Sequence, residues 1–203
     1  VVGGTIFVLG GVVGSNLDAH NWVHTRSVLR YHPASDNWAE CTQIPSGASF
    51  IATCAVGAVI YVFGGQEGYT RSEIIDGLAI PVYSKKVYKY NTVRYEWSTC
   101  EPMPMRLQQW HSATLLGGDV YVIGASCETW SDYMFRYNPV QDTWSPAAEP
   151  LFENDEYTVP FVVGGRICVY QEDSLYTYEP LVDAWSVEEA RLPSGSYTSA
   201  VTC

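Results

Sequence analysis

The residues best suited to hold a metal ion lie in one stretch near the N-terminus. Asp18, His20 and His24 place a carboxylate and two imidazoles close together in the sequence, and both groups are zinc ligands. The stretch has no helical pattern that would fix their spacing, and no third histidine is near. We therefore predict no metal site and no cofactor, and we interpret His32 and His111 as structural residues.

Motifs for covalent or phosphate chemistry are also missing. The sequence contains no G-x-S-x-G, no phosphate-cradling glycine loop and no H-E-x-x-H, which are the patterns of hydrolases, nucleotide-binding proteins and zinc proteases. Acidic pairs occur at Asp155-Glu156 and Glu172-Asp173, but neighbouring acids in a loop are usually solvated charges. The sequence predicts a protein that is not an enzyme.

The negative charge is concentrated in the second half of the chain. Residues 1–100 hold seven Lys/Arg and seven Asp/Glu, whereas residues 101–203 hold four Lys/Arg and fifteen Asp/Glu. The second half therefore carries the whole net charge of -11. An acidic surface repels phosphates, so we expect neither nucleic acid nor an anionic membrane as a partner. Two interpretations remain open for the acids: a solubilising surface, or attraction of a basic partner.

The six cysteines favour a reducing compartment. No C-x-x-C pair and no N-x-S/T sequon is present, and several cysteines lie inside apolar strand patterns, as is usual for buried free thiols. No apolar run reaches the length of a membrane span. We expect a cytoplasmic protein, with a nuclear or cytoskeletal location as alternatives. The chain begins with Val1 and not with Met, so we expect an excerpt of a longer protein.

An internal repeat organises the whole chain. A tyrosine and a tryptophan separated by six residues recur four times, at Tyr31/Trp38, Tyr90/Trp97, Tyr137/Trp144 and Tyr178/Trp185. Three of these pairs enclose a proline and an aspartate, which is typical of a turn between two strands. The spacing predicts four β-hairpins in which the tryptophans hold equivalent positions, packed between neighbouring repeats.

A glycine-bounded block precedes each of these hairpins. Residues 3–11, 57–65 and 117–125 share a first glycine turn, an apolar strand and a closing small pair, and residues 164–172 keep all but the closing glycines. The first glycines predict a tight turn, and the closing pair predicts a close approach of backbones. Each repeat is thus four strands, a to d: strand a is apolar, b ends at the closing pair, c carries Tyr and d carries Trp.

This pattern resembles the kelch repeat over essentially all 203 residues, and most of all the repeats of the BTB-kelch (Kelch-like) proteins. The resemblance implies an all-β kelch β-propeller with four-stranded blades, about four of which are present in residues 1–203. We expect strands b to d of one blade in residues 1–44, closed by residues 194–203, and further blades in 45–104, 105–150 and 151–193. The number of blades usual in kelch propellers favours part of a larger ring. The alternative is a four-bladed ring closed by Tyr197–Cys203 against Thr5–Leu9.

The same resemblance implies a binding face. In Kelch-like proteins partners contact the b–c loops and the loops that enter strand a, and here the b–c loops shorten from the first repeat to the fourth. The arginines that family members use for acidic peptides are missing from these positions. The predicted partner-binding residues are Val12, Trp22, Ser49, Gln66, Tyr69, Arg71, Gln108, Gln109, Ser126, Asp155, Glu156 and Asp173.

Three functions follow as hypotheses from the resemblance. The first is a protein-interaction module that recognises substrates for a cullin-type ubiquitin ligase, which would bind the cullin through domains outside this chain. The second is an actin-binding or cytoskeletal scaffold, and the third is a kelch-fold enzyme. The densest acids run from Glu149 through Glu156 to Glu172-Asp173, so a partner drawn to them would carry a basic segment.

Overall fold

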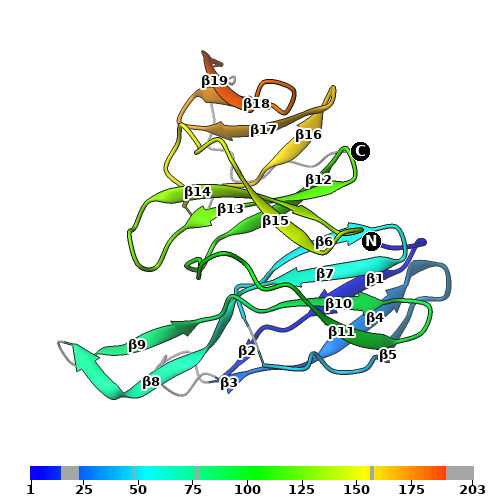
Figure 1. The fold of residues 1–203 in the computed structure, drawn as a ribbon. Coiled ribbons are helices and arrows are strands. Elements are labelled where there is room, and N and C mark those ends of the chain that lie inside the picture. The colour runs from blue at the N-terminus through cyan, green and yellow to red at the C-terminus, as the bar shows by residue number, and fades with distance from the viewer. Residues whose placement is uncertain (15–22, 48, 76–77, 156–157, 191–203) are drawn as a thin grey trace.

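The computed structural model describes residues 1–14, 23–47, 49–75, 78–155 and 158–190. In this part of the chain the regular structure is β-strand apart from a short 3-10 helix, η2 (Pro33–Ser35). Four antiparallel sheets follow one another along the chain, and Figure 1 shows them as successive blades of an arc. The predicted all-β fold with four-stranded blades is confirmed, and the first blade has three described strands.

The strands of each blade pair in chain order. The first blade holds β1 (Ile6–Leu9), β4 (Val28–His32) and β5 (Asn37–Glu40), and the second holds β6 (Ala52–Val56), β7 (Val59–Phe63), β10 (Val87–Asn91) and β11 (Glu96–Cys100). The third holds β12 (Ser112–Leu116), β13 (Asp119–Ala125), β14 (Asp132–Asn138) and β15 (Thr143–Ala147), and the fourth holds β16 (Phe161–Val163), β17 (Arg166–Gln171), β18 (Ser174–Glu179) and β19 (Ala184–Glu189). Strand β12 contacts both β6 and β16, so the a strands of adjacent blades face one another.

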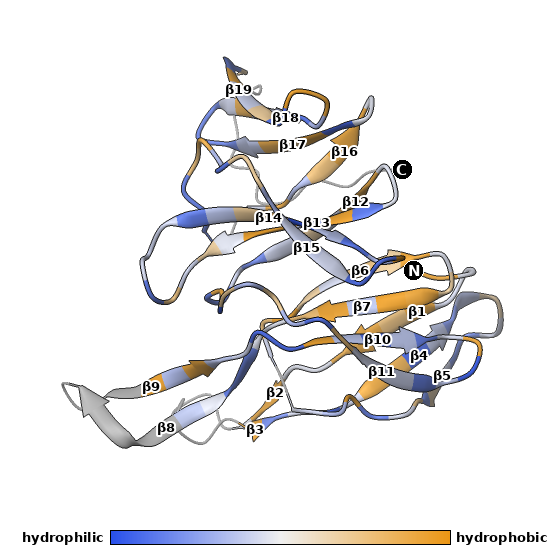
Figure 2. Cartoon of the chain, viewed as in Figure 1, coloured by the Kyte–Doolittle hydropathy of each residue, from blue (hydrophilic) through white to orange (hydrophobic). Residues whose placement is uncertain are grey.

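The b strands of the second to fourth blades carry the core, as their continuous apolar runs predict, whereas β1 in the first blade has no buried residue. Residues 60–63 of β7 are buried, whereas β5 at the outer edge of its blade is largely exposed. Figure 2 shows the same contrast between an orange β7 and a blue β5. One buried cluster joins the second and third blades around Phe63 and Tyr137, and another joins the third and fourth around Ile123 and Tyr178. Apolar burial between blades therefore holds the arc together.

Each Tyr-x6-Trp pair is a cross-strand neighbour on strands c and d. The register places Tyr31 opposite Trp38, and the other three pairs follow the same rule. The ring centroids lie 4.9, 4.8, 4.8 and 5.4 Å apart in blades one to four. These distances suit a favourable aromatic pair, and the predicted hairpins are confirmed.

Three of the four tryptophans also tie their blade to the preceding one. The indole Nε1–H of Trp97 donates to the carbonyl of Thr42 at 2.8 Å, and those of Trp144 and Trp185 donate to Glu101 and Ala148, each at 3.0 Å. Each acceptor stands just beyond the end of the d strand of the blade before. Trp38 in the first blade has no such acceptor among the described residues, and 54% of it is exposed.

The aspartate of the c–d turn completes this contact. Asp142 accepts a hydrogen bond from Tyr137 Oη at 2.6 Å and another from the backbone N–H of Glu101 at 2.9 Å. Asp142 adopts a φ of 54°, which aspartate tolerates better than most residues. The turn therefore joins a strand pair within one blade to the d strand of its neighbour. In the second blade Tyr95 occupies the equivalent turn position, also at positive φ.

Two of the predicted b–c loops contain hairpins of their own. Strands β2 (Val12–Val13) and β3 (Val23–His24) form one, and β8 (Gln66–Ile75) and β9 (Leu78–Tyr83) form a longer one that extends away from the blades in Figure 1. The β-branched and aromatic residues of 80–83 favour strand over loop. In the fourth blade the b–c connection is a two-residue turn, Glu172-Asp173, with φ of 49° and 60°.

The described residues form an open arc. Strand β1 pairs with β4 on one side and with no described strand on the other. In Figure 1 the first and fourth blades lie at opposite ends of the arc. The strand expected to close the first blade, in residues 194–203, lies outside the described residues, so the two predicted ways of closing the ring stay predictions.

His111 gives the fold a predictable pH dependence. It is buried between the second and third blades, with Nδ1 2.8 Å from the carbonyl of Gln108 and Nε2 2.9 Å from that of Phe63. Burial lowers the pKa of this imidazole, although both backbone contacts oppose that shift. Below about pH 6.5, where histidine in an unfolded chain takes up a proton, the unfolded state therefore binds more protons than the folded one.

Stability should accordingly decrease as the pH falls from about 6.5 towards the pKa of folded His111. Urea unfolding at several pH values measures this slope for the wild type and for His111→Gln. The variant should show a shallower slope in that window, while His24, whose pKa burial also lowers, contributes equally to both proteins. Equal slopes in the two proteins would show that His111 does not titrate differently on folding.

Candidate partner-binding face

The two predicted loop sets meet at the same end of the blades. In the second blade the backbone N–H of Ser49 donates to Gln66 at 3.1 Å, and that of Gln66 donates to Ser49 at 2.8 Å. In the third blade Gln108 donates from its backbone N–H to Ala125 at 2.8 Å and from Nε2 to the carbonyl of Ser126 at 3.1 Å. The segment that enters strand a is thus fastened to the end of strand b.

The fourth blade makes the same contact with side chains. Nε2 of Gln171 donates to the backbone carbonyl of Glu153 and to Oδ2 of Asp155, each at 3.0 Å. Asp155 also accepts from the hydroxyl of Thr158 at 3.0 Å. These hydrogen bonds hold the carboxylate against the end of β17 and against Thr158, so it is less free to turn towards a partner.

The predicted residues differ widely in exposure. Ser49, Gln66 and Ser126 are buried, with 3%, 1% and 1% of their surface exposed. They therefore support the conformation of the loops and are not open to direct contact. Gln108 and Gln109 are half-buried, whereas Val12 and Asp173 are exposed. Their roles in binding stay predictions.

Four further predicted residues remain, and three of them lie wholly or partly outside the described part of the chain. Tyr69 lies on β8 with its ring centroid 6.1 Å from that of His24. Arg71 is also on β8, but its side chain lies outside the described part of the chain, and Trp22 and Glu156 lie outside the described residues altogether. Their binding roles likewise stay predictions.

Two tryptophans on this face were missed by the sequence analysis. Trp110 follows Gln108-Gln109 in the segment that enters β12, and Trp130 lies in the b–c loop of the third blade. They adopt φ of 72° and 60° and are 41% and 77% exposed. A bulky residue at positive φ is strained. The sequence could have pointed to Trp130, because this residue falls inside the predicted b–c loop. Nothing in the sequence, however, separates it from a tryptophan that packs on its blade.

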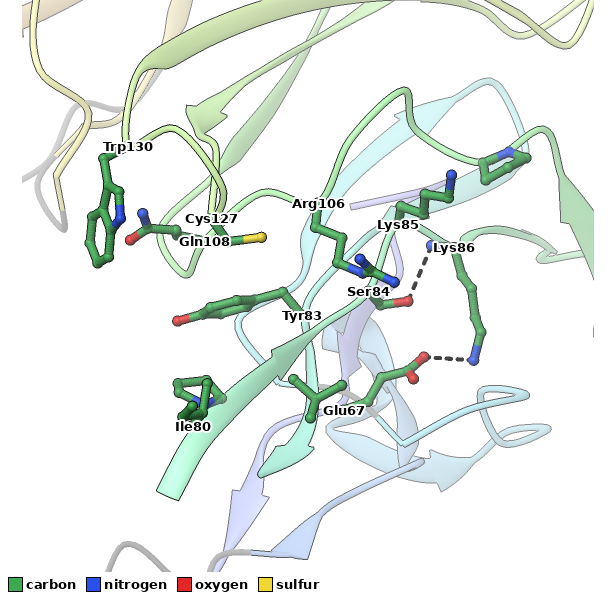
Figure 3. A pocket seen from close by; sticks show the side chains of 13 residues that line it. Glu67, Ile80, Tyr83, Ser84, Lys85, Lys86, Arg106, Gln108, Cys127 and Trp130 are labelled. Atoms are coloured by element: carbon green, nitrogen blue, oxygen red, sulfur yellow. Dashed lines mark hydrogen bonds and ion pairs between the residues drawn. The ribbon is translucent and has the colours of Figure 1, made fainter. Parts of the chain in front are cut away.

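A cavity of about 690 Å³ lies between strand β9 and the loops of the third blade. Figure 3 shows Ile80, Tyr83 and Trp130 on one side of it and Glu67, Lys86 and Arg106 on the other. Glu67 and Lys86 form an ion pair at 2.8 Å. Burial alone would raise the pKa of Glu67, but hydrogen bonds from Lys86, Ser84 and Ser46 bring it below its usual value.

The rim of this cavity keeps an excess of positive charge. Lys85 has no ion-pair partner among the described carboxylates, and Arg106 lies 4.0 Å from the exposed Glu128. Exposed pairs at such distances neutralise little charge. An otherwise acidic chain thus has a locally basic cavity at the base of the β8–β9 hairpin.

A second cavity, of about 410 Å³, adjoins the first at Gln108 and Trp130. It is lined by Trp110, Asp132 and Glu153 as well, so it combines tryptophans with carboxylates. Neighbouring cavities of opposite charge on one loop face suit a partner that lays an extended segment across it.

The described residues contain neither a group of side chains suited to a metal ion nor a helix suited to span a membrane. No three His, Cys, Asp or Glu side chains gather there in a group that could hold a metal ion. None of the helices in the described part is long and apolar enough to cross a bilayer. The described cysteines are free thiols, and burial raises the pKa of Cys54 to about 11.

Comparison with known proteins supports the repeat assignment. A family model described as Kelch motif matches residues 48–104 and 111–151. The chain is similar to Kelch-like protein 35 of Mus musculus, with 30% identity over 72% of this chain and 21% of the relative. It is also similar to Kelch-like protein 23 of Mus musculus, with 28% identity over 82% of this chain and 28% of the relative.

A third relative names a further domain. Kelch repeat and BTB domain-containing protein 12 of Homo sapiens is 26% identical over 83% of this chain and 28% of its own length. The chain spans less than a third of each of these relatives.

Proposed function

Because the chain is a kelch-repeat β-propeller segment of the BTB-kelch-like family, we propose that it binds a partner protein through its loop face and that it acts by binding, not by catalysis. The exposure of Trp110 and Trp130 on that face is the observation that carries the proposal. Exposed aromatic residues held in a strained backbone beside cavities are typical anchors of protein interfaces.

We propose further that the partner is a substrate of a cullin-type ubiquitin ligase. One relative is named for a BTB domain beside its kelch repeats. The cullin would be bound by BTB and BACK regions, which these 203 residues do not include, so this chain would supply substrate recognition alone. A cytoplasmic location is part of the proposal, and the free thiols of the described cysteines support it.

The partner is proposed to carry a basic segment. Glu149, Glu153, Glu172 and Asp173 are exposed in the fourth blade and the segment that leads into it. Carboxylates in solvent attract a basic partner over several ångströms and accelerate its association, an effect that falls as salt rises.

The test is quantitative capture of proteins from cell extract on the immobilised chain. We expect Trp110→Asn combined with Trp130→Asn to reduce the recovery of the specific partner at least about tenfold, the loss typical of an interface anchor. Asparagine tolerates positive φ, so the double variant should keep its fold.

The matched control is Val140→Asn combined with Leu181→Asn. Both residues are 92% exposed and lie at c–d turns, away from the loop face. This control should recover the partner as the wild type does. If all three proteins recover the same partners equally, the loop face is not the binding surface.

The ligase role has its own readout: excess free chain should lengthen the half-life of the recovered protein in cells, and an unchanged half-life would contradict that role.

A further inference from the structure

The smaller cavity is built from two blades. The third blade contributes Gln108 to Trp110 before β12, and Trp130 to Asp132 at the start of β14. The segment that leads into the fourth blade contributes Glu153 and Asn154. The backbone N–H of Asn154 donates to Oδ2 of Asp132 at 3.1 Å, and its side-chain Nδ2 contacts the carbonyl of Trp110 at 3.4 Å. These contacts fix the cavity walls relative to each other.

All formal charge on these walls is negative. Asp132 and Glu153 line the cavity, and no lysine, arginine or histidine does so among the described residues. Burial and the nearby charge of Glu153 raise the pKa of Asp132, although the N–H of Asn154 opposes that shift. A carboxylate in this setting is stabilised by a cation from outside the chain.

Two oxygen atoms in the same place lack a hydrogen-bond donor. Oδ1 of Asp132 and Oδ1 of Asn154 are buried and have no partner among the residues that the structure describes. Buried acceptors without a donor destabilise a protein. The surroundings of the cavity are thus short of hydrogen-bond donors, which favours a ligand rich in N–H groups over one that brings further acceptors.

The aromatic walls favour the same class of ligand. Trp110 and Trp130 both line the cavity and keep 41% and 77% of their surface exposed. Among aromatic rings, the face of tryptophan attracts cations most strongly. Resting on the proposed protein-binding function, we propose that this cavity binds an arginine side chain of the partner.

Arginine fits these features better than lysine does. Its planar guanidinium can stack on an indole and still direct several N–H groups at neighbouring oxygens, whereas an ammonium group is more strongly hydrated. The larger cavity is unsuited to the same residue, because Lys85 and Arg106 on its rim repel a cation. Gln108 and Trp130 line both cavities, and Figure 3 shows these two side chains near each other with Arg106 farther from Trp130.

The experiment uses three peptides that differ in one residue: acetyl-Ala-Arg-Ala-amide, its lysine analogue and its glutamine analogue. The indole N–H signals of Trp110 and Trp130, assigned in NMR spectra with single Trp→Phe variants, report binding. The arginine peptide should shift both signals saturably, the lysine peptide should bind more weakly, and the glutamine peptide should cause no saturable shift. The arginine affinity should fall with added salt.

Asp132→Asn keeps the size of the side chain and an oxygen for the Asn154 N–H, and it should weaken the arginine peptide at least about tenfold, the effect of losing one charge-assisted hydrogen bond. Asp36→Asn removes an equal charge in the first blade and should leave the affinity unchanged. Glu153→Gln, on an exposed residue, repeats the test without disturbing the core.

Equal binding of the arginine and glutamine peptides would overturn the proposal, and so would unchanged affinity in both Asp132→Asn and Glu153→Gln. The result also separates this inference from the proposed function. If the double tryptophan variant loses its partner while the two acid variants keep it, the loop face binds a protein but the cavity does not take an arginine.

Discussion

Trp144→Ala is expected to lower the free energy of unfolding by about 3 kcal/mol, the lower end of the usual loss for an aromatic core residue, because Trp144 is partly buried. The ring packs against Tyr137 in its own blade, at 4.8 Å between centroids, and against Phe63 of the preceding blade, at 5.8 Å. Its Nε1–H donates to Glu101 at 3.0 Å. The substitution thus removes a cross-strand pair and a contact between blades together.

Trp38→Ala is the matched control for this prediction. Trp38 keeps its cross-strand tyrosine at 4.9 Å, but 54% of it is exposed and its indole has no acceptor among the described residues. Its replacement should lower stability by about 1 kcal/mol, the scale of one aromatic pair. Urea unfolding followed by far-UV circular dichroism measures both. Equal losses at the two positions would mean that stability comes from the hairpins alone and not from the contacts between blades.

Gly124→Ala is expected to lower stability by about 3 kcal/mol, the upper end of the usual effect of overpacking. A Cβ at this position would lie 2.5 Å from Cβ and 3.2 Å from Cα of His111, and 3.2 Å from Cδ1 of Leu107. The nearest atoms are close to the backbone and cannot rotate away, so strand β12 or the end of β13 must move. This is the close approach predicted from the closing pair of the glycine-bounded block.

Gly118→Ala separates crowding from backbone strain. Gly118 has a φ of 92°, but an added Cβ there would meet nothing within 4 Å. Only the conformational penalty of alanine at positive φ remains, about 1 kcal/mol. The same unfolding measurement applies to both glycines. A loss at Gly124 no larger than that at Gly118 would show that the blades can separate at His111 without penalty.

The binding site could be predicted only in outline. The loops were found because the repeats around them are regular, and the insertions stand out against that regularity. Sequence alone did not show that residues 66–83 form a hairpin, or that Gln66 and Ser126 are buried beneath the face. Nor did it distinguish Trp130 from a tryptophan that packs inward. Such distinctions depend on which neighbouring loop covers a residue.

The amino-acid sequence by itself determined the blades. Tyrosine, tryptophan, the turn aspartate and the glycine pairs act over a few residues, through cross-strand pairing and turn geometry, so their spacing specifies each sheet. Only the tertiary structure decided which of the repeated tryptophans are buried between blades. Trp144 is partly buried and Trp38 exposed within identical motifs, because only Trp144 has a preceding blade among the described residues. It also brought Trp110, Asp132 and Glu153 to one cavity, since those residues belong to different segments that no local pattern connects.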